Sequence, residues 1–133
     1  MYYFAYASNL NYRQMSERCP DSSPLFKAVL PNYRLIFAKW RRKWRSGVAT
    51  IKPYKEDKVF GAVYEISDRC LCVMDGYEDC PAVYDHLNVV VFKDDGEAVE
   101  AVTYIRREQS EETQPSQEYL AVIRQGYKDW GIA

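Results

Sequence analysis

The sequence predicts an α+β domain, in which a small, mixed, partly closed β-barrel-like sheet of about six or seven strands packs with about three helices. Short runs of β-branched and aromatic residues recur between turn residues, and other segments carry apolar residues at helical spacing. The chain has 133 residues, 47% of them hydrophobic, and shows no internal repeat or linker. We therefore expect a single domain over residues 1–133 that can bury its own core.

The chain opens with a strand, a tight turn and the start of a helix. Residues 2–6 form a short, largely aromatic run suited to a buried strand. Ser8 and Asn9 follow, and such side chains favour turns and helix N-caps because they hydrogen-bond to nearby backbone. Residues 11–19 then fit a short amphipathic helix. Backbone N–H groups point outward at such a junction, so it can bind an anion or oxyanion, although many such turns bind no ligand.

The middle of the chain predicts strands separated by turns. Residues 25–39 predict two strands joined at 31–32. Residues 47–51 and 59–66 predict two more, with a turn at 53–58 between them.

A later hairpin and two helices complete the domain. Residues 83–92 and 99–105 predict strands joined by an Asp-Asp-Gly turn at 94–96. Ser67 is a suitable N-cap for the helix before this hairpin, and Ser116 for the last helix, which Gly131 ends. The predicted buried stripes are Leu71, Met74 and Tyr77 in the first of these helices, and Tyr119, Leu120, Ile123, Tyr127 and Trp130 in the second.

One short segment is strongly basic. It contains Lys39, Arg41, Arg42, Lys43 and Arg45, interleaved with Trp40 and Trp44. Alternating cations and aromatics suit a nucleic-acid surface, but the chain as a whole has a formal net charge of −1, so the positive charge is local. We favour a solvated loop, or a rim that attracts an anionic small molecule, and we expect no nucleic-acid partner.

The N-terminal segment and the cysteines indicate the cellular compartment. The opening apolar run is too short for a signal segment or a membrane span, so we expect a cytoplasmic protein with no membrane association. Cys19, Cys70, Cys72 and Cys80 are then expected to be reduced thiols. The spacing of Cys70, Cys72, Cys80 and His86 matches no usual zinc pattern, and we expect neither a metal nor a cofactor.

Glu78 is the carboxylate best suited to chemistry. It follows an apolar helical stripe, and because the helix dipole disfavours negative charge at a C-terminal end, a carboxyl there is suited to accept a proton. On pattern alone, an exposed acid beside Asp75 and Asp79 is the commoner arrangement. The chain also has 12 tyrosines, of which several converging on one pocket would offer neutral hydrogen-bond donors.

Three motifs carry a resemblance to a known family. They are Tyr-Phe-Ala-Tyr-Ala-Ser-Asn-Leu at 3–10, Met-Asp-Gly-Tyr-Glu-Asp at 74–79 and Pro-Ser-Gln-Glu-Tyr-Leu at 115–120. The first resembles the Tyr-Gly-Ser-Asn-Leu loop, and the second the Leu-Asp-x-x-Glu-Gly motif, of the γ-glutamylcyclotransferase-like (AIG2-like) family. The third is similar to the C-terminal helix of its γ-glutamylcyclotransferase branch. Residues 47–51 and 59–64 also look like core segments of the family, so the similarity covers nearly the whole chain.

The resemblance implies an enzyme that cyclises a γ-glutamyl peptide or amine to 5-oxoproline and releases the amine. It assigns the general acid/base to Glu78 and implies a small-molecule γ-glutamyl substrate, no cofactor and a possible homodimer. The implied substrate-binding residues are Tyr6, Ala7, Ser8, Asn9, Leu10, Tyr84, Tyr104 and Tyr119. We therefore expect Glu78 to share a cavity with the bend at Ser8 and Asn9, and Ser8→Ala or Asn9→Ala to weaken binding more than folding.

Two departures from the family motifs keep a second reading open. Ala7 stands where the family has Gly, which is costly if the position needs a positive φ, and Asp79 adds a negative charge after Glu78 in place of another Gly. A non-catalytic small-molecule binding module on the same fold is therefore an alternative, and nucleic-acid binding through the basic segment a less favoured one. The motifs are compatible with Cys-Gly, an amino acid or a lysine-type ε-amine as leaving group.

Overall fold

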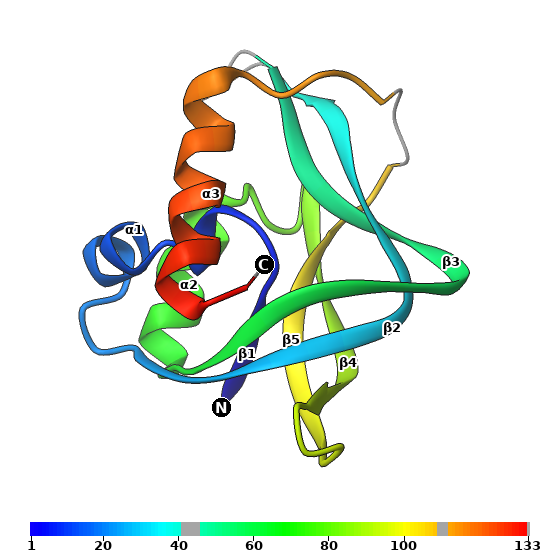
Figure 1. Ribbon diagram of the computed structural model, residues 1–133. Helices are drawn as coiled ribbons and strands as arrows, with labels where there is room; N and C mark the ends of the chain where they lie inside the picture. The colour runs from blue at the N-terminus through cyan, green and yellow to red at the C-terminus, as the bar shows by residue number, and fades with distance from the viewer. Residues whose placement is uncertain (41–45, 109–111, 133) are drawn as a thin grey trace.

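The computed structural model describes residues 1–40, 46–108 and 112–132 of the chain, without the side chains of residues 39, 40 and 46 (Figure 1). Its elements are β1 (Tyr2–Ala5), the 3-10 helix η1 (Ser8–Leu10), α1 (Tyr12–Arg18), β2 (Ser23–Trp40), β3 (Ser46–Glu65), α2 (Asp68–Tyr77), β4 (Tyr84–Lys93), β5 (Ala98–Arg106) and α3 (Gln117–Trp130). The expected α+β class is confirmed.

The strands form one closed barrel in the order β1-β3-β2-β4-β5. β1 closes it by pairing in parallel with β5 at Tyr3 and Val102, whereas the other neighbours are antiparallel. The sheet is therefore mixed, as predicted, and closed rather than partly closed. Figure 1 shows the three α-helices gathered on one side of the barrel, away from the bent part of β2 and β3.

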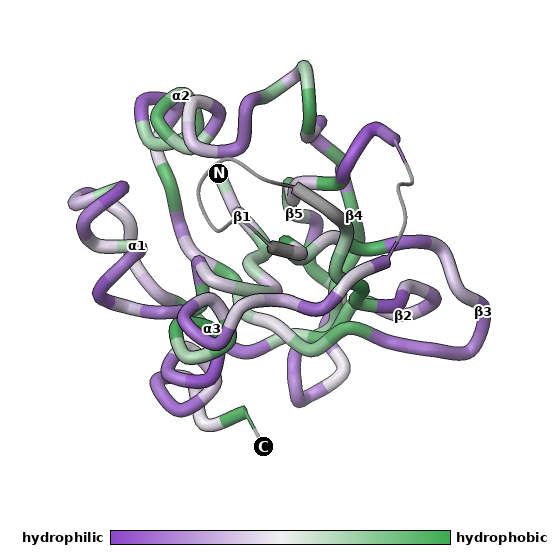
Figure 2. The backbone as a smooth tube through the Cα atoms, turned by 90° about the horizontal axis from the view of Figure 1, so that it is seen from above, coloured by the Kyte–Doolittle hydropathy of each residue, from purple (hydrophilic) through white to green (hydrophobic). Residues whose placement is uncertain are grey.

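The predicted strand count was too high, because two expected turns lie inside long strands. β2 and β3 pair along most of their length, and the register shifts between Pro24 and Phe26 and again between Pro31 and Tyr33. Asn32 and Glu56 absorb the extra residues with φ of 64° and 69°, and the Asn32 side chain accepts a hydrogen bond from the Glu56 N–H at 3.2 Å. The bend is a bulge of the kind that interrupts a ladder without ending it. Figure 2 shows this bend of β3 as a hydrophilic segment on the outside of the barrel.

α2 and α3 begin at the expected capping residues and α3 ends at the expected glycine, whereas α1 is capped by Asn11 and not by Ser8 or Asn9. The Ser67 and Ser116 side chains accept hydrogen bonds from the N–H groups of Cys70 and Tyr119, and Gly131 ends α3 with φ of 67°. In α2, Met74 is fully buried, as predicted for the buried stripe. Tyr77 is 49% exposed, so its predicted place in that stripe is wrong. No helix in the described ranges has the length and apolarity to cross a membrane.

A disulfide joins α1 to α2, which contradicts the expectation that all four cysteines are reduced. Cys19 follows the last residue of α1, Cys70 lies in the first turn of α2, and their Cα atoms are 5.3 Å apart. The two residues are 51 positions apart, so only the packing of the helices brings them together. Cys72 and Cys80 are free cysteines.

Candidate active site

The turn after β1 is held in place through its carbonyl groups. The hydroxyl of Tyr64 donates to the carbonyl of Asn9 at 2.8 Å, and the indole N–H of Trp130 donates to that of Leu10 at 3.0 Å. The N–H of Leu10 is used within the turn, since it donates to the Ala7 carbonyl at 3.0 Å. A barrel strand and the C-terminal helix therefore fix the backbone of η1.

A glycine allows α3 to approach this turn closely. A Cβ at Gly126 would lie 2.7 Å from the backbone nitrogen of Asn11 and 2.7 Å from the Cβ of Leu10. Contacts that short are sterically forbidden, so any larger residue at 126 would push the helix away from η1. The Asn11 side chain adds a bond of 3.2 Å to the Val122 carbonyl of the same helix.

Beside η1 lies a pocket of about 60 Å³, which the predicted residues line together with others. It is lined by Tyr3, Tyr6, Ala7, Ser8, Asn9, Arg18, Val48, Ala49, Tyr77, Glu78, Tyr84, Tyr104 and Tyr119. Glu78 thus shares a cavity with Ser8 and Asn9, as expected. Leu10 is the predicted site residue that does not line it, because its side chain is fully buried in the core.

Glu78 enters the pocket from the end of α2. It is the residue that caps this helix, its N–H donates to the Met74 carbonyl at 2.9 Å, and its side chain is partly buried. Burial raises the pKa of five pocket tyrosines, and the negative charge of Glu78 raises the pKa of each further. These tyrosines are Tyr3, Tyr6, Tyr84, Tyr104 and Tyr119. They stay neutral at physiological pH, and Glu78 lies within electrostatic reach of all of them.

Backbone hydrogen bonds orient the pocket tyrosines. The Tyr6 hydroxyl donates to the Tyr104 carbonyl at 2.7 Å. The Tyr84 hydroxyl donates to the Ala49 carbonyl at 2.7 Å, and the Ala49 N–H donates to the Tyr119 hydroxyl at 3.0 Å. The Tyr119 hydroxyl also hydrogen-bonds to the Ser8 side chain.

Asn9 supports the pocket through its amide. Its nitrogen donates to the Tyr3 hydroxyl at 3.0 Å, and its oxygen accepts from Gln14 at 3.1 Å and from Arg18 at 3.0 Å. The residue is 5% exposed. The side chain therefore ties β1 and α1 together, and its polar atoms are already engaged within the protein.

Arg18 is a pocket residue that the sequence reasoning missed. Its guanidinium lies 4.3 Å from the ring centroid of Tyr77, a second missed residue, and bonds to Asn9. Among the residues that line the pocket, Arg18 and Glu78 are the charged ones. Arg18 and Tyr77 belong to helical segments in which exposed polar and aromatic side chains are common, so no local pattern distinguishes them. The other lining residues that were not predicted are Tyr3, Val48 and Ala49, which lie in strands.

The two departures from the family motifs have different structural consequences. Ala7 has φ of −141°, so its methyl group carries none of the cost of a positive φ. Asp79 has φ of 49°, in the left-handed region that favours Gly and that Asp tolerates better than most residues. The prediction for the basic segment stays untested, because residues 41–45 lie outside the described part of the chain.

Comparisons with known proteins identify the family and the fold. Residues 58–133 match the model of the AIG2-like family. Over 135 aligned positions the chain is 30% identical to the γ-glutamylcyclotransferase of Bos taurus and 29% identical to that of Homo sapiens, covering 98% of this chain and 71% of each relative. A solved structure titled γ-glutamyl cyclotransferase superposes with a TM-score of 0.93 at 28% identity, over 99% of this chain and 80% of the other. The chain therefore belongs to the AIG2-like family of γ-glutamylcyclotransferase-like proteins.

Proposed function

We propose that this protein is a γ-glutamylcyclotransferase-type enzyme, which converts a γ-glutamyl peptide or amine to 5-oxoproline and releases the amine. The observation that carries the proposal is that Glu78 and the turn at Ser8 and Asn9 line one tyrosine-rich pocket. Relatives named for this activity support it, because they match nearly the whole chain.

Glu78 acts as the general acid and base in this proposal. The α-amino nitrogen of the substrate attacks its own γ-carbonyl carbon, which forms a five-membered ring, and the bond from that carbon to the leaving nitrogen breaks. Glu78 takes a proton from the attacking nitrogen and returns one to the leaving nitrogen, so its protonation state is restored. A positioned acid/base of this kind typically contributes about 10²- to 10⁴-fold in rate.

The rest of the pocket binds and folds the substrate. Arg18 is the cation available to the α-carboxylate, and we assign the N–H groups of Ser8 and Asn9, at the start of η1, to the developing oxyanion. The Tyr84, Tyr104 and Tyr119 side chains surround the γ-glutamyl group as neutral groups. Holding the amine against its own carbonyl lowers the activation barrier by several kcal/mol, because the substrate no longer has to lose conformational freedom before the ring closes.

Replacement of the acid tests the proposal. Glu78→Gln removes the proton acceptor with little change in volume, so we expect normal folding and a loss of about 10²-fold or more in 5-oxoproline formation. The matched control is Glu100→Gln, since Glu100 is exposed on β5 and does not line the pocket. A panel of γ-glutamyl peptides, amino acids and ε-amines assayed for 5-oxoproline identifies the leaving group. If Glu78→Gln kept more than a tenth of wild-type activity, the base would be another residue.

Two binding measurements separate the alternatives. Thermal stabilisation by γ-glutamyl compounds without product would select the non-catalytic binding module. Steeply salt-dependent binding of nucleic acid, lost on replacing Arg41 and Arg42, would select the basic segment. We also propose a cytoplasmic location, no nucleic-acid partner and a possible homodimer, which fractionation and sedimentation would test.

A further inference from the structure

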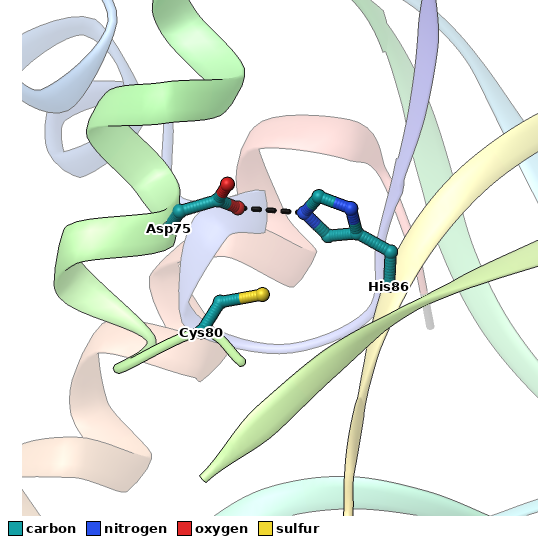
Figure 3. Close-up of side chains that lie close together, drawn as sticks. All are labelled: Asp75, Cys80 and His86. Atoms are coloured by element: carbon teal, nitrogen blue, oxygen red, sulfur yellow. Dashed lines mark hydrogen bonds and ion pairs between the residues drawn. The ribbon is translucent and has the colours of Figure 1, made fainter. Parts of the chain in front are cut away.

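A second cluster of chemically reactive side chains lies next to the pocket but outside it. Asp75 projects from the last turn of α2, Cys80 from the turn that follows, and His86 from β4 (Figure 3). One potential ligand atom from each lies within 4.8 Å of the others. Asp75 and Cys80 are partly buried and His86 is exposed, so the cluster opens to solvent. None of the three lines the pocket that contains Glu78.

We propose that Asp75, Cys80 and His86 bind a zinc ion, with water in the fourth position. Thiolate, imidazole and carboxylate are the ligand types that Zn²⁺ uses, and three protein ligands with water in the fourth position are typical of catalytic zinc sites. Thiolate and imidazole disfavour Mg²⁺ and Ca²⁺, which prefer oxygen. The inference does not depend on the proposed function.

The distances fit after small side-chain movements. Tetrahedral zinc with bonds of about 2.0–2.3 Å places neighbouring ligand atoms about 3.3–3.6 Å apart. His86 Nε2 and Asp75 Oδ1 are 2.7 Å apart, and the widest pair in the cluster is within 4.8 Å. Shifts of about 1 Å bring all three to zinc distances, and rotation of partly exposed side chains supplies shifts of this size. Zinc binding at Nε2 replaces the hydrogen bond between His86 and Asp75, so the neutral imidazole carries its proton on Nδ1, and the Cys80 thiol proton is released to solvent.

The backbone holds the cluster without the metal. The Cys80 N–H donates to the Asp75 carbonyl at 2.9 Å, which keeps the thiol beside the carboxylate one turn earlier. Asp75 Oδ1 also accepts from the Tyr104 hydroxyl at 2.5 Å. A hydrogen bond to a ligating carboxylate is the outer-shell support that orients ligands at zinc sites. Here it also links the proposed site to the pocket that Tyr104 lines.

The local charge favours a cation. The carboxylates of Asp75, Asp85 and Glu78 all interact electrostatically with the Cys80 sulfur. Three negative charges around one side chain attract a divalent ion. The exposed ring of His86 gives the ion an entry path from solvent.

Cobalt binding tests the site directly, because Co²⁺ replaces Zn²⁺ in such sites and a cobalt–thiolate bond gives a charge-transfer absorption band. The whole protein, in thiol-free buffer, should show this band with one equivalent of Co²⁺, and Zn²⁺ should displace it. Cys80→Ser should abolish the band, and His86→Ala should weaken Zn²⁺ binding at least about tenfold, the smallest loss expected for a ligand-shell change. His86 is exposed, so the second variant should fold normally, which its melting temperature would verify.

Cys72→Ser is the matched control, because Cys72 is an exposed free cysteine outside the cluster. It should keep both the band and the affinity. No band with the wild type, a band that survives Cys80→Ser, or a band lost in Cys72→Ser would each overturn the proposal.

Discussion

Asn9→Ala separates the two roles that a turn residue beside a pocket can have, binding a substrate or holding the fold together. The structure favours the second, which revises the expectation from the sequence. The substitution removes bonds to Tyr3, Gln14 and Arg18. Two are neutral, at about 1 kcal/mol each, and the bond to Arg18 adds about 1 kcal/mol after allowance for its partial exposure. We expect a total loss of about 3 kcal/mol in the free energy of unfolding.

The melting temperature converts this loss into a measurement. An unfolding entropy of about 2.1 cal/mol/K per residue gives about 0.28 kcal/mol/K for this chain, so Asn9→Ala should lower Tm by about 11 °C. Ser8→Ala is the control from the same turn. Ser8 lines the pocket and hydrogen-bonds to Tyr119, so its removal should cost about 1 kcal/mol or less in stability and act mainly on KM.

Calorimetry and a 5-oxoproline assay on both variants decide the matter. The reasoning is refuted if Asn9→Ala melts within about 3 °C of the wild type while turnover disappears. Asn9 would then be a substrate ligand whose internal bonds contribute little. A large fall in the Tm of Asn9→Ala, together with a normal KM measured on its folded fraction, would support the structural role of Asn9.

Two further predictions concern stability. Asp79→Ala should be about 1 kcal/mol less stable than Asp79→Gly in urea unfolding, because both variants lose the carboxylate but only Ala pays for φ of 49°, and equal stabilities would contradict a left-handed residue there. The double variant Cys19→Ala/Cys70→Ala opens a loop of 51 residues, so we expect a loss of up to about 4 kcal/mol, or about 14 °C in Tm, with Cys72→Ser unchanged. If the double variant lost less than about 1 kcal/mol in stability, and Cys19 and Cys70 of the wild type could both be alkylated, the wild-type pair would be reduced.

Local signals in the sequence were enough to predict most secondary-structure elements and to single out the residues of the family motifs. Alternating β-branched and aromatic runs mark the strands, and Ser67 and Ser116 mark the helix starts, because capping and periodicity involve neighbours within a few positions. The motif at 74–79 also singled out Glu78. The strand count failed at Asn32, since a bulge and a turn use the same residues, and only pairing on both sides distinguishes them.

The tertiary structure alone decided which distant side chains meet. Arg18 reaches the pocket, Cys19 meets Cys70, and His86 meets Asp75, although no local pattern connects these residues. Asn9 likewise hydrogen-bonds to Tyr3, Gln14 and Arg18, which its local sequence does not indicate. The physical reason is that periodicity and propensity act over a few residues, whereas a barrel closed by β1 and β5 joins segments about a hundred positions apart, as in the bond from Thr103 to the Phe4 carbonyl.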